Sequence, residues 1–142
     1  MPEPVMDAEQ LSEFLFGHMP TARDVYRIEH AGADGVRMRV PVDERNVRPG
    51  GTVSGPTMMA LADSAAWMVT IQHIGPVPLS VTSSLNISFL AKPELRDLLA
   101  HASLLRLGRR QSVSEVRLWS DGGTPDEPVA HAVVTYAIPA GR

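Results

Sequence analysis

The chain has 142 residues, a net charge of −3 and no cysteine, a length that fits one domain spanning residues 1–142. The acidic balance and low aromatic content argue against nucleic-acid binding, and the absence of cysteine excludes disulfides and thiol nucleophiles. The acidic start of the chain and the absence of an apolar run of about 18 residues predict a cytoplasmic protein without a membrane partner.

The first predicted element is a short helix near the N-terminus. Asp7 followed by Gln10 is a capping-box pattern, and apolar residues then recur at helical spacing until Gly17 to Pro20 ends the run. We therefore predict a helical arm within residues 1–20.

Two strands are predicted next, at residues 24–30 and 36–42, on either side of the turn sequence GADG. The second strand alternates apolar and basic residues, which is typical of a half-buried strand. A polar loop, DERNVRPGG, then leads to the central helix, with Pro56 as its expected first residue.

The central predicted helix runs from Pro56 to His73 and is apolar around most of its circumference. This pattern is typical of a helix that protein encloses on nearly all sides. Its one carboxylate is Asp63. Because an unpaired charge is costly in apolar surroundings, Asp63 must be paired, hold a proton or take part in chemistry.

Four further strands are predicted after the helix, at residues 79–89, 97–107, 111–120 and 128–138. In the first of them the odd-numbered positions from Leu79 to Phe89 should share one face, because the side-chain period of a strand is two. Strands and helices that do not alternate as βαβ units favour an α+β fold, an antiparallel sheet with helices on one side.

Four segments carry a family resemblance: GTVSGPTMMALADSAAW, VTSSLNISFLAKP, LLRLGRRQSVSEV and PVAHAVVTYAIP. Together they resemble the hotdog-fold acyl-CoA thioesterases of the PaaI-like, phenylacetic-acid-pathway type over roughly residues 34–139. The family motif before the central helix is Gly-Thr-Val-His-Gly-Gly. Here Ser54 stands in place of the His and Pro56 in place of the second Gly.

The resemblance implies an antiparallel sheet wrapped around the central helix and a homodimer with a continuous sheet, often paired into a homotetramer. It also implies hydrolysis of an acyl-CoA substrate at the dimer interface, with no metal and no cofactor apart from the coenzyme A of the substrate. These are expectations about fold, activity and partners.

The resemblance also implies roles for individual residues. Asp63 would be the general base or the nucleophile, and the backbone N–H of Gly55 would polarise the thioester carbonyl. Ser54 occupies the position of the catalytic-loop His, and Arg48 lies where many relatives carry Asn or Gln. Thr82 matches a hydroxyl position that helps to hold the attacking water.

The residues themselves support part of this scheme. The unpaired N–H groups at a helix start make Gly55 a credible oxyanion site, although residues 54–56 also fit a plain helix start. Asp63 lies about 10 Å further along the axis than Pro56, at 1.5 Å per residue. If both groups serve one reaction they must come from different chains, so the mechanism itself predicts a dimer.

Four more residues are candidates for substrate binding. Trp67, one turn beyond Asp63, fits the floor of an acyl pocket or an ordinary core position. Lys92, Arg109 and Arg110 suit the phosphates of coenzyme A, or solvated surface positions. The His residues lack metal-site spacing and no Ser lies in a glycine elbow, which disfavours metal hydrolysis and a serine triad.

Two alternative functions stay open. The change from His to Ser54 suggests a non-catalytic acyl-CoA-binding protein. A hotdog enoyl-CoA hydratase or dehydratase would need an Asp and a His close together in the motif helix, and no His lies within nine positions of Asp63.

Overall fold

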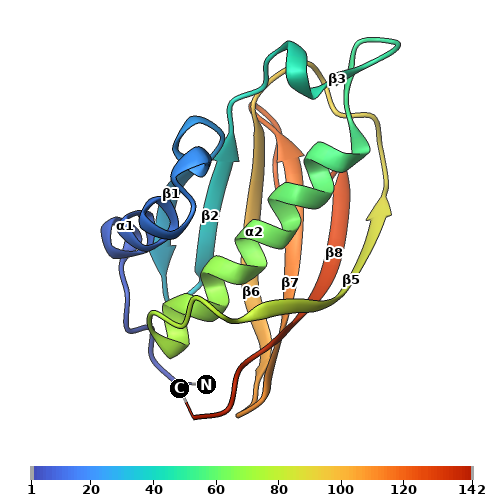
Figure 1. Ribbon diagram of the computed structural model, residues 1–142. Coiled ribbons are helices and arrows are strands. Elements are labelled where there is room, and N and C mark those ends of the chain that lie inside the picture. Colours follow the sequence, from blue (N-terminus) through green and yellow to red (C-terminus); the bar gives the residue numbers. More distant parts are fainter. Residues whose placement is uncertain (1, 142) are drawn as a thin grey trace.

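The computed structural model describes residues 2–141 (Figure 1). Two α-helices, two 3₁₀ turns and eight strands make up the described chain. In order they are α1 (Ala8–His18), η1 (Pro20–Asp24), β1 (Arg27–Gly32), β2 (Gly35–Val40), η2 (Glu44–Asn46), β3 (Val47–Arg48), β4 (Thr52–Val53), α2 (Gly55–Ile74), β5 (Val81–Phe89), β6 (Leu98–Leu107), β7 (Gln111–Ser120) and β8 (Ala130–Ala137).

Six of these strands form one antiparallel sheet in the order β1-β2-β6-β7-β8-β5. Helix α2 runs diagonally across one face of this sheet, and α1 lies on the same side, beside β1 (Figure 1). The predicted architecture, an antiparallel sheet around a long central helix, is therefore confirmed. Each predicted strand is present, with ends shifted by a few residues.

The contact between α2 and the sheet is built from small residues. The helix contributes Ala62, Ala65 and Ala66, all buried, and the sheet contributes buried alanines on β6 and β8. Small side chains on both surfaces allow the helix axis to lie close to the strands. The larger Leu118 and Val116 of β7 fill the space beneath it.

The N-terminal arm begins as predicted. Asp7 and Gln10 form a reciprocal capping box, with both N···O distances 2.9 Å. The strand expected at residues 24–30 begins later, at Arg27, because the chain first forms the 3₁₀ turn η1 and the N–H groups of Val25 and Tyr26, just after it, donate to the Ala22 oxygen.

The predicted burial of the central helix is wrong in its first half. Pro56, Met59 and Ala60 are exposed, and Asp63 and Trp67 are only partly buried. These residues form one open stripe along α2, whereas the second half of the helix is almost fully buried. The helix also begins one residue earlier than expected, at Gly55. Helix α2 is therefore apolar on two surfaces: one packs against the sheet, and the other, the open stripe, is not covered by the described chain.

The predicted facing of the strand at 79–89 is also wrong at its start. A bulge between Thr82 and Ser84 shifts the register of β5 against β8. The side chains that face the helix are therefore at even-numbered positions before the bulge and at odd-numbered positions after it. Thr82 consequently points to the helix side, as do Leu85 and Ile87 further along the strand. An extra residue in a strand moves every later side chain to the opposite face.

Candidate active site

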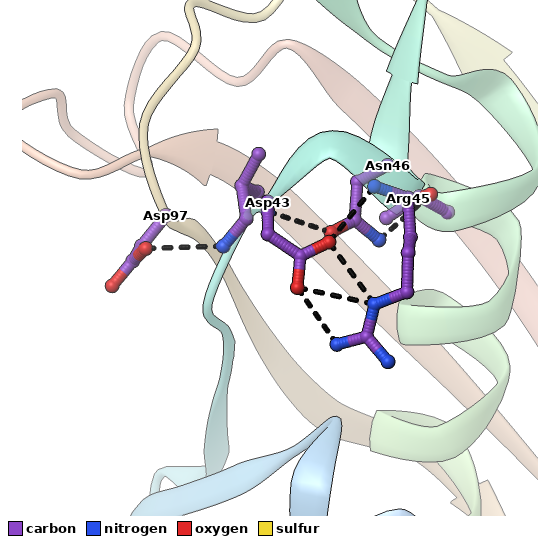
Figure 2. Close-up of polar contacts among 6 residues, drawn as sticks. Asp43, Arg45, Asn46 and Asp97 are labelled. Carbon is purple, nitrogen blue, oxygen red and sulfur yellow. Dashed lines mark hydrogen bonds and ion pairs between the residues drawn. The ribbon is translucent and has the colours of Figure 1, made fainter.

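A short segment of tight turns positions the start of α2. The Asp43 side chain accepts the backbone N–H of Arg45 at 2.8 Å and pairs with its guanidinium at 2.7 Å, as Figure 2 shows. Asn46 accepts the Asp43 N–H through its side chain and the Ser54 N–H through its backbone oxygen. The Asn46 side chain also donates to Thr57 Oγ1 at 3.4 Å. These contacts tie the polar loop to the first turn of the helix.

Between Asn46 and Ser54 the chain makes a small hairpin that the sequence did not predict. Strands β3 and β4 pair through Arg48 and Thr52, and the turn contains Gly50 and Gly51 with φ angles of 96° and 75°. Glycine adopts this left-handed region at no steric cost, so the hairpin can close within a few residues. The turn places the Arg48 side chain beside the helix start.

The first depression of the candidate site lies at this helix start. It has a volume of about 450 Å³, and Arg48, Gly55, Phe89 and Lys92 are among the residues that line it. Neither Arg48 nor Lys92 pairs with a carboxylate within residues 2–141. The structure therefore brings together three of the predicted site residues: the cations Arg48 and Lys92, and Gly55 at the N-terminus of the helix.

Ser54 and Gly55 have different functions in this helix start. Ser54 is the N-cap: its Oγ accepts the Thr57 N–H at 3.3 Å and lies 2.8 Å from Thr57 Oγ1. The Ser54 hydroxyl therefore caps the helix, which agrees with the plain structural interpretation of this residue. The Gly55 N–H has no backbone or side-chain acceptor within residues 2–141, as expected for the first N–H of a helix.

Asp63 lies further along α2 and is paired with hydroxyl groups. Thr82 Oγ1 donates to Asp63 Oδ1 at 2.6 Å, and the Tyr136 hydroxyl donates to the same oxygen at 2.9 Å. Of the three alternatives that the sequence left open for this carboxylate, the structure shows the first: it is paired through hydrogen bonds. The two donors come from β5 and β8, neighbouring strands of the sheet.

Tyr136 is a candidate site residue that the sequence analysis missed. Burial and the nearby Asp63 charge raise the pKa of Tyr136, so its hydroxyl keeps its proton and acts as a donor. The only signal in the sequence is its position in PVAHAVVTYAIP, a strand in which an inward-facing Tyr needs a polar partner. That partner lies 73 residues away in the chain, beyond the reach of local patterns.

The second depression surrounds Asp63. It has a volume of about 390 Å³ and is lined by Met19, Asp63, Trp67, Pro78, Ser80, Val81, Thr82 and Tyr136. Trp67 packs edge-on against Phe14 of α1, with ring centroids 5.4 Å apart. The wall of this depression is mostly apolar, with one carboxylate and several hydroxyls at its edge.

Two predicted binding residues lie elsewhere. Arg109 and Arg110 form the turn between β6 and β7, where the Arg110 oxygen accepts the Ile138 N–H after the end of β8. Lys92 follows β5 near the opposite end of the sheet, since Leu90 and Ala91 bond to Val129 just before β8 begins. Within one chain, these arginines do not join the depression that Arg48 and Lys92 line.

Neither a metal cluster nor a membrane-spanning helix occurs in the described chain. Among residues 2–141, no three His, Asp or Glu side chains lie close enough together to hold a metal ion. In the same range, no helix is long and apolar enough to cross a membrane.

The chain is similar to known thioesterases in both sequence and structure. The sequence profile of the thioesterase superfamily matches residues 50–126. A provisionally named esterase of Halobacterium salinarum is 34% identical over 113 residues, which make up 75% of this chain and 74% of that protein. A provisionally named thioesterase from Silicibacter sp. TM1040 has a solved structure with a TM-score of 0.88 and 41% sequence identity, covering 96% of this chain and 94% of its own.

A more distant neighbour is similar to this chain in fold only. A mutant of the phenylacetic acid degradation protein PaaI from Thermus thermophilus is 22% identical, with a TM-score of 0.71 over 84% of this chain and 99% of its own.

The antiparallel sheet wrapped around a long helix is the hotdog fold, which the chain shares with the Silicibacter thioesterase structure. The family profile covers more than half of the chain, and the Halobacterium relative covers three quarters of it. The chain belongs to the thioesterase superfamily, and it is a thioester hydrolase.

Proposed function

We propose that the protein hydrolyses an acyl-CoA thioester to a carboxylic acid and free coenzyme A. Asp63 is the general base for water or the direct nucleophile, and the Gly55 N–H polarises the thioester carbonyl. The observation that carries this proposal is the presence of two depressions, one around the carboxylate and one around the free N–H. The proposed reaction uses no metal and no cofactor apart from the coenzyme A of the substrate.

The edge of the sheet supports a shared site between two chains. Strand β5 bonds to β8 on one side only, and its exposed Val81 and Phe89 leave an apolar edge open within the described chain. An unpaired edge with apolar residues is a template for pairing with another strand. We therefore propose a homodimer in which β5 pairs with β5 of a second copy.

This pairing would bring the two depressions together. Thr82, beside Asp63, lies near the start of β5, whereas Gly55 lies beside Phe89 at the end, with 3.6 Å between the Phe89 ring and the position of a Gly55 Cβ. A two-fold pairing centred on Leu85 puts Val81 opposite Phe89 of the second copy. Asp63 of one chain then faces Gly55 of the other.

The substrate would lie across this interface. The apolar wall around Trp67 suits the acyl group, and Arg48 and Lys92 suit the anionic part of coenzyme A. Arg109 and Arg110 would have to contribute from another chain, because their hairpin lies away from Lys92. The family resemblance adds a homotetramer as the proposed assembly of two such dimers.

Subunit complementation tests the shared site. Asp63→Asn and Gly55→Pro chains, each inactive alone, should recover about a quarter of wild-type activity when co-expressed in equal amounts. Half of the dimers are then mixed, and each mixed dimer has one site with both groups intact. Mixing two chains that both carry Asp63→Asn is the control. Absence of recovery in dimers shown to be mixed would contradict a site shared between chains.

Arg48→Ala should lower kcat more than it raises KM. Arg48 lines the same depression as Gly55 and has no acidic partner within residues 2–141, so it can stabilise the negative charge that develops on the carbonyl oxygen. Steady-state kinetics on the best acyl-CoA substrate, with Arg45→Ala as the matched control in the same loop, measure this effect. A rise in KM alone would assign Arg48 to binding of coenzyme A, and unchanged kinetics would remove it from the site.

Two observations bear on the alternative functions. Within residues 2–141 of one chain, the hydrogen-bond partners of Asp63 are the hydroxyls of Thr82 and Tyr136 and not the imidazole that a hydratase or dehydratase would pair with it on the motif helix. A non-catalytic binder would hold acyl-CoA without releasing free thiol. A panel of CoA thioesters of different acyl length, assayed for thiol release and for binding, distinguishes these cases.

A further inference from the structure

We infer that Tyr136 and Thr82 act together as positioning residues that fix the Asp63 carboxylate and leave Oδ2 as its reacting oxygen. This inference rests on the proposed function, because it assigns the part of Asp63 that meets water or the thioester. It adds Tyr136 to the site and changes the role of Thr82 from holding water to holding the carboxylate.

Both donors lie on one oxygen of the carboxylate. Thr82 Oγ1 and the Tyr136 hydroxyl are 2.6 Å and 2.9 Å from Asp63 Oδ1, whereas Oδ2 accepts no hydrogen bond from residues 2–141. The Tyr136 hydroxyl also lies 3.1 Å from the Asp63 backbone oxygen, so its proton is shared between the side chain and the backbone of the same residue. A hydroxyl has a single proton to donate. Thr82 therefore has no proton left to donate to a water while it bonds Asp63, and the lone pairs of Oδ2 are the ones left for the substrate side.

The two donors are held by the sheet, so the carboxylate is fixed from outside its own helix. Thr82 and Tyr136 are paired residues in neighbouring strands β5 and β8, and the bulge after Thr82 turns its side chain toward α2. Two hydrogen bonds from paired neighbouring strands restrict the rotation of the Asp63 side chain. A base that is already oriented avoids the cost of ordering it during the reaction.

The effect of these two hydrogen bonds on Asp63 can be measured as the dependence of kcat/KM on pH. The titratable groups that face it are Tyr136 of β8 and Tyr26, just before β1, and burial raises the pKa of both tyrosines. Both are therefore neutral across the working pH range. Hydrogen bonds to a carboxylate favour its charged form, so we expect the activity of a variant that lacks one donor to fall off at a higher pH than that of the wild type.

The test compares pH profiles of kcat/KM for Tyr136→Phe and Thr82→Val with that of the wild type, using one acyl-CoA substrate. Each variant should move the acidic limb upward by about one pH unit, the scale of one hydrogen bond to a charged group. On that limb, activity at a fixed pH should then fall about tenfold. Thr82 is exposed on the edge strand, so Thr82→Val tests the inference even if Tyr136→Phe fails to fold.

Matched controls remove a neighbouring hydroxyl that does not bond Asp63. Ser83→Ala loses the hydroxyl that bonds Thr135 O, and Tyr26→Phe loses a half-buried phenol near the same helix. Both should leave the acidic limb in place. An acidic limb that is unchanged in both Tyr136→Phe and Thr82→Val would overturn the inference, whereas absence of thioester hydrolysis by the wild type would overturn the proposed function instead.

Discussion

Asp63→Asn should lower kcat by at least about 100-fold, the scale of losing a general base, while the protein keeps its fold. Asn has the same shape, and its side-chain oxygen can still accept from Thr82 and Tyr136, but it has neither the charge nor the basicity of a carboxylate. Steady-state hydrolysis of an acyl-CoA measures the loss.

A thermal melt of the Asp63→Asn protein is the control for this result, and it should match the wild type to within a few degrees, the scale of a ~1 kcal/mol change. Hydrolysis at the wild-type rate would remove Asp63 from the mechanism. A large fall in melting temperature would instead assign the carboxylate a structural role in joining α2 to β5 and β8.

Gly55→Pro should lower kcat by about 10²- to 10³-fold, the effect of removing one oxyanion donor, whereas Gly55→Ala should change it little. Proline removes the N–H but is tolerated at the first helical position. The preceding residue is compatible with proline, since Ser54 has φ −70° and ψ 150°, the extended conformation that precedes proline.

The comparison between the two Gly55 variants separates the N–H from the side chain. Both variants add a Cβ, which would meet the Phe89 ring at an ordinary 3.6 Å contact distance, but only proline removes the donor. Activity assays and melts of both proteins decide the outcome. Equal activity of Gly55→Pro and Gly55→Ala would show that this N–H does not polarise the carbonyl.

Local patterns in the sequence were sufficient for the two α-helices and the six strands of the main sheet, but not for the short hairpin of β3 and β4. The capping box at Asp7, the apolar periodicity of α2 and the alternation in the later strands are properties of neighbouring residues, and each element forms where they indicate. The separation of Gly55 and Asp63 also followed from the sequence, because the rise per residue of a helix is constant. The motif residues in turn identified the hotdog family.

The tertiary structure decided which groups meet Asp63. Tyr136 reaches it across 73 residues, and Thr82 reaches it only because a bulge in β5 reverses the facing of the strand. Neither effect has a local signature, since strand pairing and bulges depend on the partner strand. The open stripe of α2 has the same origin: composition marks a surface as apolar, but only packing decides whether the same chain covers it.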